Sequence, residues 1–129
     1  MIELTEKSNE NKIVAEWAEG KKYYHVSVSR FYYSLYQKLL HINIVKKLGV
    51  KKKYGGYSHY DFVTDCMTAL SGRMTDEEIA WISQMRDLRK IRDDAEYSDK
   101  EFENKFYNLG FKYPYMNIDN VLNRFLSGR

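Results

Sequence analysis

The stretch VSRFYYSLYQKLLHI, residues 28–42, decides the fold of this chain. Its large apolar residues recur at spacings of three, four, four and three, which places them on one face of an α-helix. These residues are Val28, Phe31, Leu35, Leu39 and Ile42. The stretch contains β-forming residues, but they do not alternate with polar ones as a strand requires. The pattern therefore predicts an amphipathic helix whose apolar face needs a partner surface.

Glycines divide the rest of the sequence into helical segments. Gly49, the pair Gly55–Gly56 and Gly72 fall between stretches of helical periodicity, where glycine breaks or ends a helix. Gly20 lies inside the first periodic region and can interrupt or bend it. The pattern predicts several helices joined by short connections, so neighbouring helices should pack mostly antiparallel.

Helix-start signals define the later segments. Ser58 can cap a helix, and T-x-x-E at Thr75 and S-x-x-E at Ser98 are capping boxes. Pro114 predicts a loop or a kink, because proline lacks the N–H group that a helix interior uses. The expected helices cover about residues 12–48, 59–70 and 75–97, a fourth from residue 98, and a last one over 118–126. We therefore expect one all-α domain, residues 1–129, built as an up-and-down bundle of four to five helices.

The composition excludes several classes of protein. A formal net charge of +3 over 129 residues is too small for a DNA-coating protein. The single cysteine, Cys66, cannot form an intrachain disulfide, and no stretch is apolar for long enough to span a bilayer. Residues 1–12 lack the pattern of a signal peptide, so we expect a cytoplasmic protein without membrane contact. No His, Cys or acidic residues have metal-ligand spacing, and we expect no metal or other cofactor.

Tyrosine is unusually frequent, with twelve residues in this short chain. Five of them fall in the first helical region: Tyr23, Tyr24, Tyr32, Tyr33 and Tyr36. Tyrosine has an apolar ring and a polar tip, so these residues can pack a helical core and a dimer interface. The alternative is that they stack the bases of a single-stranded nucleic acid.

Arg92 stands out in the third expected helix because of its position in the helical pattern. Residues of one stripe recur there at spacings of four, three, four and three. The stripe consists of Trp81, Met85, Leu88, Arg92 and Ala95. An arginine on an apolar face needs a partner, because burying its charge alone is very costly. Arg92 can pair with Glu96 one turn later and help to close the helix, or it can line a cleft and bind a phosphate.

The segment MRDLRKIRDDAEYSDKE, residues 85–101, resembles the signature of HEPN domains (higher eukaryotes and prokaryotes nucleotide-binding). In that signature an arginine and a polar residue precede a histidine near the end of the third helix. One bacterial subgroup has R-x-x-R-x-x-A-[DE]-Y in place of the histidine motif. The matching residues here are Arg89, Arg92, Asp93 and the run Ala95-Glu96-Tyr97.

Two further stretches resemble the same subgroup. SVSRFYYSLYQKLL, residues 27–40, has its arginine followed by a Tyr-Tyr pair and a small-plus-aromatic run. The matching residues are Ser29, Arg30, Tyr32, Tyr33 and Tyr36. A weaker match is YSH, residues 57–59, which contributes His59. Together the matches span about residues 21–105, which is most of the chain.

The resemblance implies a helical bundle that commonly forms a homodimer, with arginine motifs from two protomers facing one cleft. Active members of the family are metal-independent endoribonucleases, and many are toxins, phage-defence factors or partners of small nucleotidyltransferases. By this resemblance the partners of the chain would be RNA or a nucleotide, a second copy, and an antitoxin or nucleotidyltransferase. The residues carried over as RNA- or nucleotide-binding are Arg30, Tyr33, His59, Arg89, Arg92 and Asp93. Arg92 and Tyr97 occupy the positions of the catalytic pair.

Tyr97 departs from the catalytic pattern, because it stands where active relatives have histidine. A free tyrosine has a pKa near 10, against about 6.5 for histidine, so it is a poor base at neutral pH. Three hypotheses follow: an RNA- or nucleotide-binding domain with little nuclease activity, an active ribonuclease in which His25 or His59 replaces the base, and a helical interaction module such as an antitoxin or a regulator. Tyr97 favours binding over catalysis, and the sequence does not separate RNA from protein as the ligand.

Overall fold

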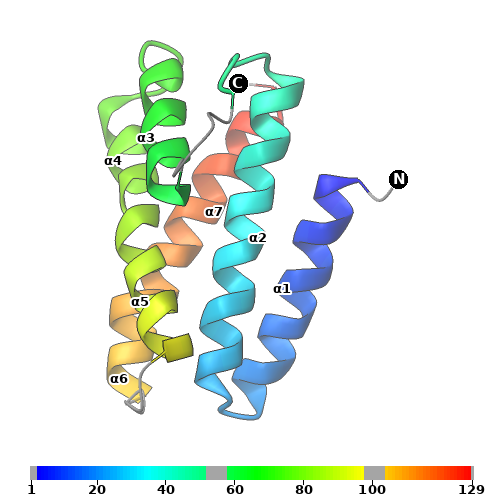
Figure 1. Ribbon diagram of the computed structural model, residues 1–129, viewed down its shortest axis with the longest axis vertical. Helices are drawn as coiled ribbons and strands as arrows, with labels where there is room; N and C mark the ends of the chain where they lie inside the picture. Colours follow the sequence, from blue (N-terminus) through cyan, green and yellow to red (C-terminus); the bar gives the residue numbers. More distant parts are fainter. Residues whose placement is uncertain (1–2, 52–57, 98–103, 129) are drawn as a thin grey trace.

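The computed structural model of the chain describes residues 3–51, 58–97 and 104–128, without the side chains of residues 96, 97 and 104. These residues form helices and contain no β-strand, apart from one isolated bridge between Ser71 and Met74. The helices are α1 (Leu4–Gly20), α2 (Tyr24–Val45), α3 (His59–Leu70), α4 (Asp76–Ser83), α5 (Met85–Tyr97), α6 (Asn104–Phe106), the π-helix η1 (Tyr107–Lys112) and α7 (Tyr113–Leu126) (Figure 1). The all-α prediction is confirmed. Within the described residues, no helix is long and apolar enough to cross a membrane.

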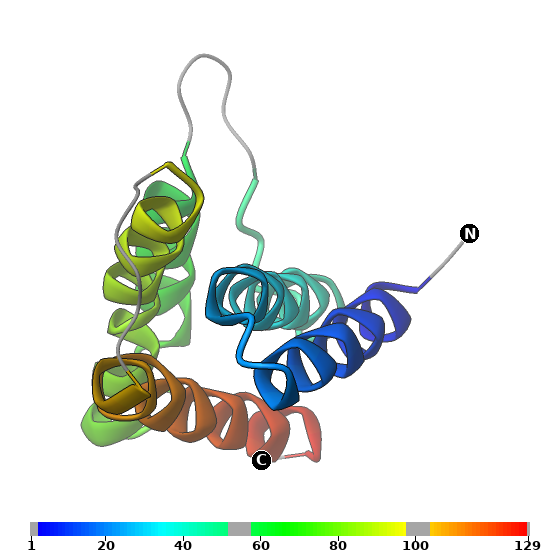
Figure 2. The same cartoon turned by 90° about the horizontal axis from the view of Figure 1, so that it is seen from below.

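Helix α2 is central to the bundle. It packs against α1 on one side and against α5 and α7 on others, while α3 and α4–α5 stand together beyond it (Figure 2). The apolar stripe within residues 28–42 explains the central position of α2, since all five of its side chains are buried. Exposing such a face to water would cost roughly 25 cal/mol per Å² of apolar surface, so the other helices gather around it.

The helix directions follow the expected alternation except at one place. Helices α1 and α4–α5 run antiparallel to α2, but α3 runs parallel to it (Figure 1). Two contacts fix this direction. His59, at the start of α3, lies beside Tyr32 in the middle of α2, whereas Arg73, just after α3, donates to the carbonyl of Lys46 just after α2. The up-and-down prediction therefore fails at α2–α3, because α3 begins beside the middle of α2 and not beside its C-terminal end.

The first expected helix is two antiparallel helices. α1 begins earlier than predicted, and the chain reverses directly after Gly20. Lys22 has φ of 62°, and the Tyr23 amide donates to the carbonyl of Ala18 at 2.8 Å, which closes the turn. The Ser27 hydroxyl then donates to the carbonyl of Ala15 at 3.0 Å and joins the two helices. The glycine marked the break in the pattern, but the reversal depends on packing between α1 and α2.

The cap predictions for α3 and α4 are confirmed. The Ser58 hydroxyl accepts a hydrogen bond from the Asp61 amide at 3.2 Å, and Thr75 and Glu78 form a reciprocal capping box. The third expected helix, however, is interrupted at Gln84 between α4 and α5. The Ser83 hydroxyl donates to the Ala80 carbonyl at 2.6 Å, a local bond that competes with the regular helical pattern.

The C-terminal part differs from the predicted loop or kink. α6, η1 and α7 follow one another without a loop, and Pro114 lies in the first turn of α7. In a regular helix, the proline ring would collide with the carbonyl of Gly110 four residues earlier. The wider π-turn over Tyr107–Lys112 comes directly before the proline, where such turns relieve this conflict. The capping box predicted at Ser98 lies outside the described residues.

Candidate functional site

Arg92 lies where its position in the pattern predicted, at the contact of α5 with α2. Met85, Leu88 and Ala95 on the same stripe are buried, and Arg92 itself is only 8% exposed. Trp81, also predicted as core, is only half-buried. The prediction of a buried stripe is thus confirmed on α5. On α4, before the break at Gln84, the stripe residue is only partly buried.

The guanidinium of Arg92 joins α5 to α2. Nη2 donates to the Tyr33 hydroxyl at 2.5 Å, and Nη1 donates to Oδ1 of Asp93 at 2.9 Å. The guanidinium carbon also lies 4.7 Å from the centre of the Tyr33 ring. The carboxylate beside Arg92 is therefore that of Asp93. The predicted pair with Glu96 involves a side chain that lies outside the described residues. These contacts hold the planar group in one orientation.

Arg89 shares the same carboxylate. Its Nε donates to both oxygens of Asp93, at 3.1 and 3.3 Å. Burial by itself would lower the pKa of Arg89, but the hydrogen bonds and charge of Asp93 outweigh it and raise that pKa. On the other side, burial raises the pKa of Tyr32 to about 12, although the positive charge of Arg89 opposes the rise. Arg89 is thus charged and Tyr32 is neutral at physiological pH.

His59 belongs to an aromatic stack beside this group. Its ring lies on that of Tyr36, with centres 3.8 Å apart and planes 13° apart, and its Nδ1 is 3.3 Å from the Tyr32 hydroxyl. The Tyr33 ring is nearly perpendicular to that of His59, with centres 6.0 Å apart. His59 therefore packs against Tyr33 and is not one of the residues that line the pocket beside Arg92.

A pocket of about 450 Å³ opens between α2 and α5 on the other side of Tyr33. It is lined by His25, Val26, Ser29, Arg30, Tyr33, Arg92 and Ala95, and is called the Arg92 pocket below. Arg30 is exposed, and its Nη1 donates to Oδ1 of Asn11 at 3.1 Å. The lining residues within the described part of the chain include two guanidinium groups and no carboxylate. The structure thus brings together Arg30, Tyr33 and Arg92, which the sequence placed in two separate motifs.

A second pocket, of about 530 Å³, has Asp93 but not Arg92 in its lining. Its lining consists of Ser58, Tyr60, Ser83, Arg86, Asp87, Arg89, Lys90 and Asp93. Arg86 is held there against the Tyr60 ring, 5.0 Å from its centre. Two carboxylates offset much of the positive charge, so this pocket suits an anion less well than the Arg92 pocket.

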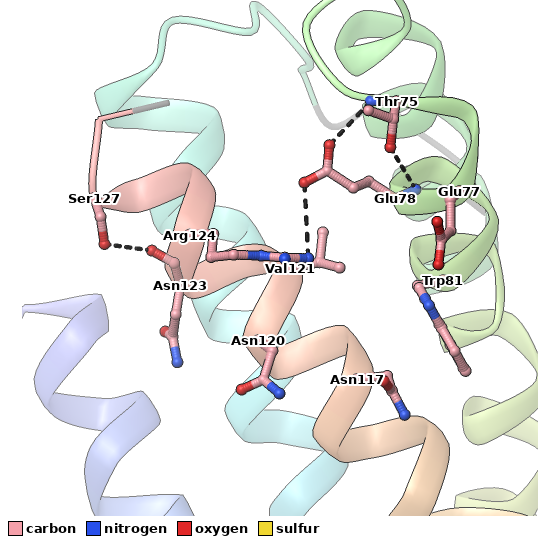
Figure 3. Close-up of a pocket in the computed structure, with 10 residues that line it drawn as sticks. All are labelled: Thr75, Glu77, Glu78, Trp81, Asn117, Asn120, Val121, Asn123, Arg124 and Ser127. Carbon is pink, nitrogen blue, oxygen red and sulfur yellow. Dashed lines mark hydrogen bonds and ion pairs between the residues drawn. The ribbon is translucent and has the colours of Figure 1, made fainter.

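The largest of the three pockets, about 700 Å³, lies elsewhere, between α4 and α7 (Figure 3). Its walls carry Glu77, Glu78 and Trp81 on α4 and several amide side chains on α7. Arg124 reaches across it to Glu78, with 3.9 Å between nitrogen and oxygen (Figure 3). It contains none of the residues that the sequence singled out for binding or catalysis, and its carboxylates would repel a phosphate.

Tyr97 is the last residue of α5, but its side chain lies outside the described residues, so its role stays a prediction. Within the described residues, no group of three or more His, Cys, Asp or Glu side chains could hold a metal ion. Cys66 is buried among the core residues, and burial raises the pKa of its thiol to about 12. It is therefore not poised as a nucleophile.

The sequence reasoning missed a buried ion pair between α2 and α7. Lys38 Nζ lies 2.5 Å from Oδ1 of Asp119 and donates to Oδ1 of Asn123 at 2.8 Å. The signal was present, since Lys38 falls three residues after Leu35 and four before Ile42 on the same apolar face. A lysine on an apolar helix face needs a partner for the same reason as Arg92.

Comparison with known proteins adds no family. No protein-family model matches the chain, and neither a curated protein nor a solved structure matches it significantly. The HEPN resemblance therefore rests on the sequence motifs quoted above and stays a prediction.

Proposed function

We propose that this chain binds RNA or a nucleotide through a phosphate group in the Arg92 pocket. The observation that carries the proposal is the approach of Arg30 on α2 and Arg92 on α5 to one pocket whose described lining has no carboxylate. Two guanidinium groups can hold a phosphate by charge-assisted, two-pronged hydrogen bonds.

The two arginines would contribute differently. Arg92 is buried and oriented by Tyr33 and Asp93, so it can present a fixed edge to a ligand at little entropic cost. Arg30 is exposed and can adjust to the position of the phosphate. Ser29 and Tyr33 line the same pocket beside the two arginines. A contact of this kind weakens as salt rises.

The resemblance to the HEPN subgroup supports the proposal independently. The matching residues Arg30, Tyr33 and Arg92 come from stretches far apart in the sequence, yet they line one pocket. A place in a toxin–antitoxin, phage-defence or mobile-element conflict system belongs to the same proposal and rests on the resemblance alone.

Binding is tested with Arg30→Ala and a labelled single-stranded RNA or mononucleotide. Because Arg30 is exposed, the variant should unfold within about 0.5 kcal/mol of the parent. Its affinity should fall tenfold or more, ~1.4 kcal/mol. Raising salt from about 50 to 200 mM should weaken binding of the parent more than that of the variant.

The matched control is Arg73→Ala. Arg73 is also exposed, but it contacts the other end of α2, at Lys46. It should leave affinity unchanged. Equal binding by the parent and Arg30→Ala, or an equal loss in both variants, would remove the Arg92 pocket as the binding site.

Ribonuclease activity is a second candidate, because His25 lines the same pocket as Arg92. A histidine there could take the proton of an RNA 2′-hydroxyl while that oxygen attacks the phosphate held by the arginines. The bond from phosphorus to the 5′-oxygen then breaks, and that oxygen takes a proton from water. The test is electrophoresis of RNA incubated with the parent, His25→Ala and the control His41→Ala, which changes a histidine of α2 outside the pocket. Cleavage that is lost only in His25→Ala supports this candidate, and no cleavage by the parent excludes it.

Tyr97→His is the companion variant. It restores the residue that catalytic relatives have at this position. Cleavage gained by this variant, with none by the parent, would mean that the pocket binds RNA and lacks only a base. If neither protein cuts RNA, the binding proposal is still decided by the affinity of Arg30→Ala.

A further inference from the structure

The Arg92 pocket adjoins the turn that joins α1 to α2. Two of its lining residues, His25 and Val26, belong to the first turn of α2, and Val26 is 42% exposed. Tyr23 stands immediately before α2, three residues from Val26, which is the spacing of neighbours on one helix face. Helix α5, which carries Arg92, ends at the same end of the molecule as this turn (Figure 1). A ligand in the pocket therefore lies close to the turn.

Two aromatic rings are exposed at this turn, and they are called the aromatic pair below. Trp17, in the last turn of α1, is 57% exposed and Tyr23 is 53% exposed. Their ring centres are 5.8 Å apart and their planes meet at 66°. The backbone of the turn brings them together, because the Tyr23 amide donates to the carbonyl of Ala18 at 2.8 Å. Exposed aromatic rings next to positively charged groups can stack the bases of a single strand.

Basic groups lie on both sides of the aromatic pair. On one side are the two guanidinium groups of the Arg92 pocket, and on the other are Lys21 and Lys22, which are both exposed. Glu19, an acidic residue of the last turn of α1, is engaged by Lys112 of η1, whose Nζ donates to its two oxygens at 2.6 and 2.8 Å. The charges around the aromatic pair therefore suit phosphates on either side of a stacked base.

We propose that the aromatic pair is a stacking subsite for a nucleobase, and that Lys22 binds a phosphate next to this base. The inference rests on the proposed function and extends it from one phosphate to a strand of several nucleotides. Tyr23 precedes Arg30 by seven residues, or about 10 Å along α2. At about 3.4 Å per stacked nucleotide, this length corresponds to about three nucleotides. The base on the aromatic pair therefore belongs to the same strand as the phosphate in the Arg92 pocket.

Acidic residues limit the course of this strand. Glu10 and Glu6 are exposed on α1, seven and eleven residues before Trp17, which places them on the same side of the helix as its ring. A phosphate there would meet charges of its own sign. The strand therefore passes from the aromatic pair to the lysines of the turn and does not continue along α1.

The first experiment compares Tyr23→Ala with the matched control Tyr113→Ala. Tyr113 is 58% exposed and meets Trp81 edge to face with centres 6.0 Å apart, so both variants remove an exposed ring from a similar pair. The probes are a labelled single-stranded RNA of about six nucleotides, within the usual range of site sizes, and adenosine monophosphate. Tyr23→Ala should bind the RNA about tenfold more weakly and bind the mononucleotide as the parent does. Tyr23→Phe keeps the ring and should bind both probes normally, as should Tyr113→Ala.

The outcomes separate this subsite from the proposed function. If Arg30→Ala loses RNA affinity and Tyr23→Ala does not, the stacking subsite is wrong, the aromatic pair serves another partner such as a protein, and the proposed function stands. If neither variant loses affinity, the proposed function fails and the subsite fails with it. An equal loss in Tyr23→Ala and Tyr113→Ala, or in Tyr23→Ala and Tyr23→Phe, also overturns stacking on the ring. Circular dichroism establishes that each variant is folded.

The second experiment tests the phosphate beyond the aromatic pair with Lys22→Ala and the control Lys47→Ala. Both lysines are exposed and have positive φ, 62° and 53°, so the two changes affect the backbone alike. Lys22→Ala should weaken binding of the six-nucleotide RNA several-fold and make it less dependent on salt, because one phosphate contact is lost. Lys47, at the other end of α2, should have no such effect. The same salt dependence in Lys22→Ala and the parent, or an equal loss in both variants, overturns this contact.

Discussion

Two cations are buried to the same degree in this protein but in different surroundings. Lys38 on α2 and Arg92 on α5 are each 8% exposed. Lys38 faces Asp119 and Asn123 from α7, and Lys12 approaches the second oxygen of Asp119 at 3.4 Å. Arg92 faces Tyr33 and Asp93, and also lines an open pocket.

The difference shows what burial of a charge can and cannot indicate. A charge on an apolar helix face must have partners, and both residues have them. The carboxylate partner of Lys38, Asp119, is buried, and Lys38 itself lines none of the three pockets described above, so its role is structural. Arg92 has structural partners and also lines the Arg92 pocket. The neighbouring cavity, and not the burial itself, is what points to a ligand.

The largest effect is expected at the closed site. Asp119→Ala leaves the Lys38 ammonium buried without its carboxylate and should lower the free energy of unfolding by about 3–5 kcal/mol. Urea unfolding followed by circular dichroism measures it. The double variant Lys38→Met with Asp119→Leu should recover most of the loss, because it removes both charges. A loss under about 1 kcal/mol in Asp119→Ala would mean that the pair is not buried in solution.

Leu88→Ala tests the burial of the helix that holds Arg92. Leu88 is 1% exposed and lies one turn before Arg92 on the same stripe. Its truncation should cost about 2–5 kcal/mol, as large-to-small core changes do. The same urea experiment measures it. A cost below about 0.5 kcal/mol would show that α5 does not present this face to the core, and the argument for Arg92 would fall with it.

Arg92→Ala compares the open site with the closed one directly. The variant loses hydrogen bonds to Tyr33 and Asp93, so some stability should be lost. The distinguishing result is a fall in RNA affinity of tenfold or more, ~1.4 kcal/mol, measured where the variant is folded. If affinity is unchanged while stability falls as in Asp119→Ala, Arg92 has the same structural role as Lys38.

The smallest effect is expected at an exposed pair. Arg124 and Glu78 are 3.9 Å apart, and the Arg124 side chain is 56% exposed. Arg124→Ala should change the free energy of unfolding by less than about 1 kcal/mol and leave RNA affinity unchanged. A larger loss of affinity would move the binding site to the pocket between α4 and α7.

Local signals in the sequence predicted part of this fold well. The bounds of α3 and the caps at Ser58 and Thr75 follow from residues close together in the chain, and the structure agrees. The reversal after Gly20 and the parallel run of α3 beside α2 depend on contacts between distant segments. No window of sequence contains them, which is why those predictions were incomplete.

The candidate site was predicted in the same uneven way. Periodicity placed Arg92 on the buried face, and the motif resemblance named Arg30 and Tyr33. Neither could show that the three residues meet in one pocket, nor that Asp93 joins Arg89 to Arg92. The Lys38–Asp119 pair was missed because its two members lie on helices whose contact the sequence does not specify.

The π-turn at Tyr107–Lys112 has a consequence for changes in chain length. It holds one residue more than an α-helix of the same height, so removing the exposed Asn108 would leave a regular helix. The part of the helix that precedes position 108 would then rotate about the helix axis by about 100° relative to α7. Tyr107, whose hydroxyl donates to Glu19 at 2.9 Å and lies 2.7 Å from the Ser27 hydroxyl, would lose both neighbours. Position 108 should therefore accept many side chains and still not accept a deletion.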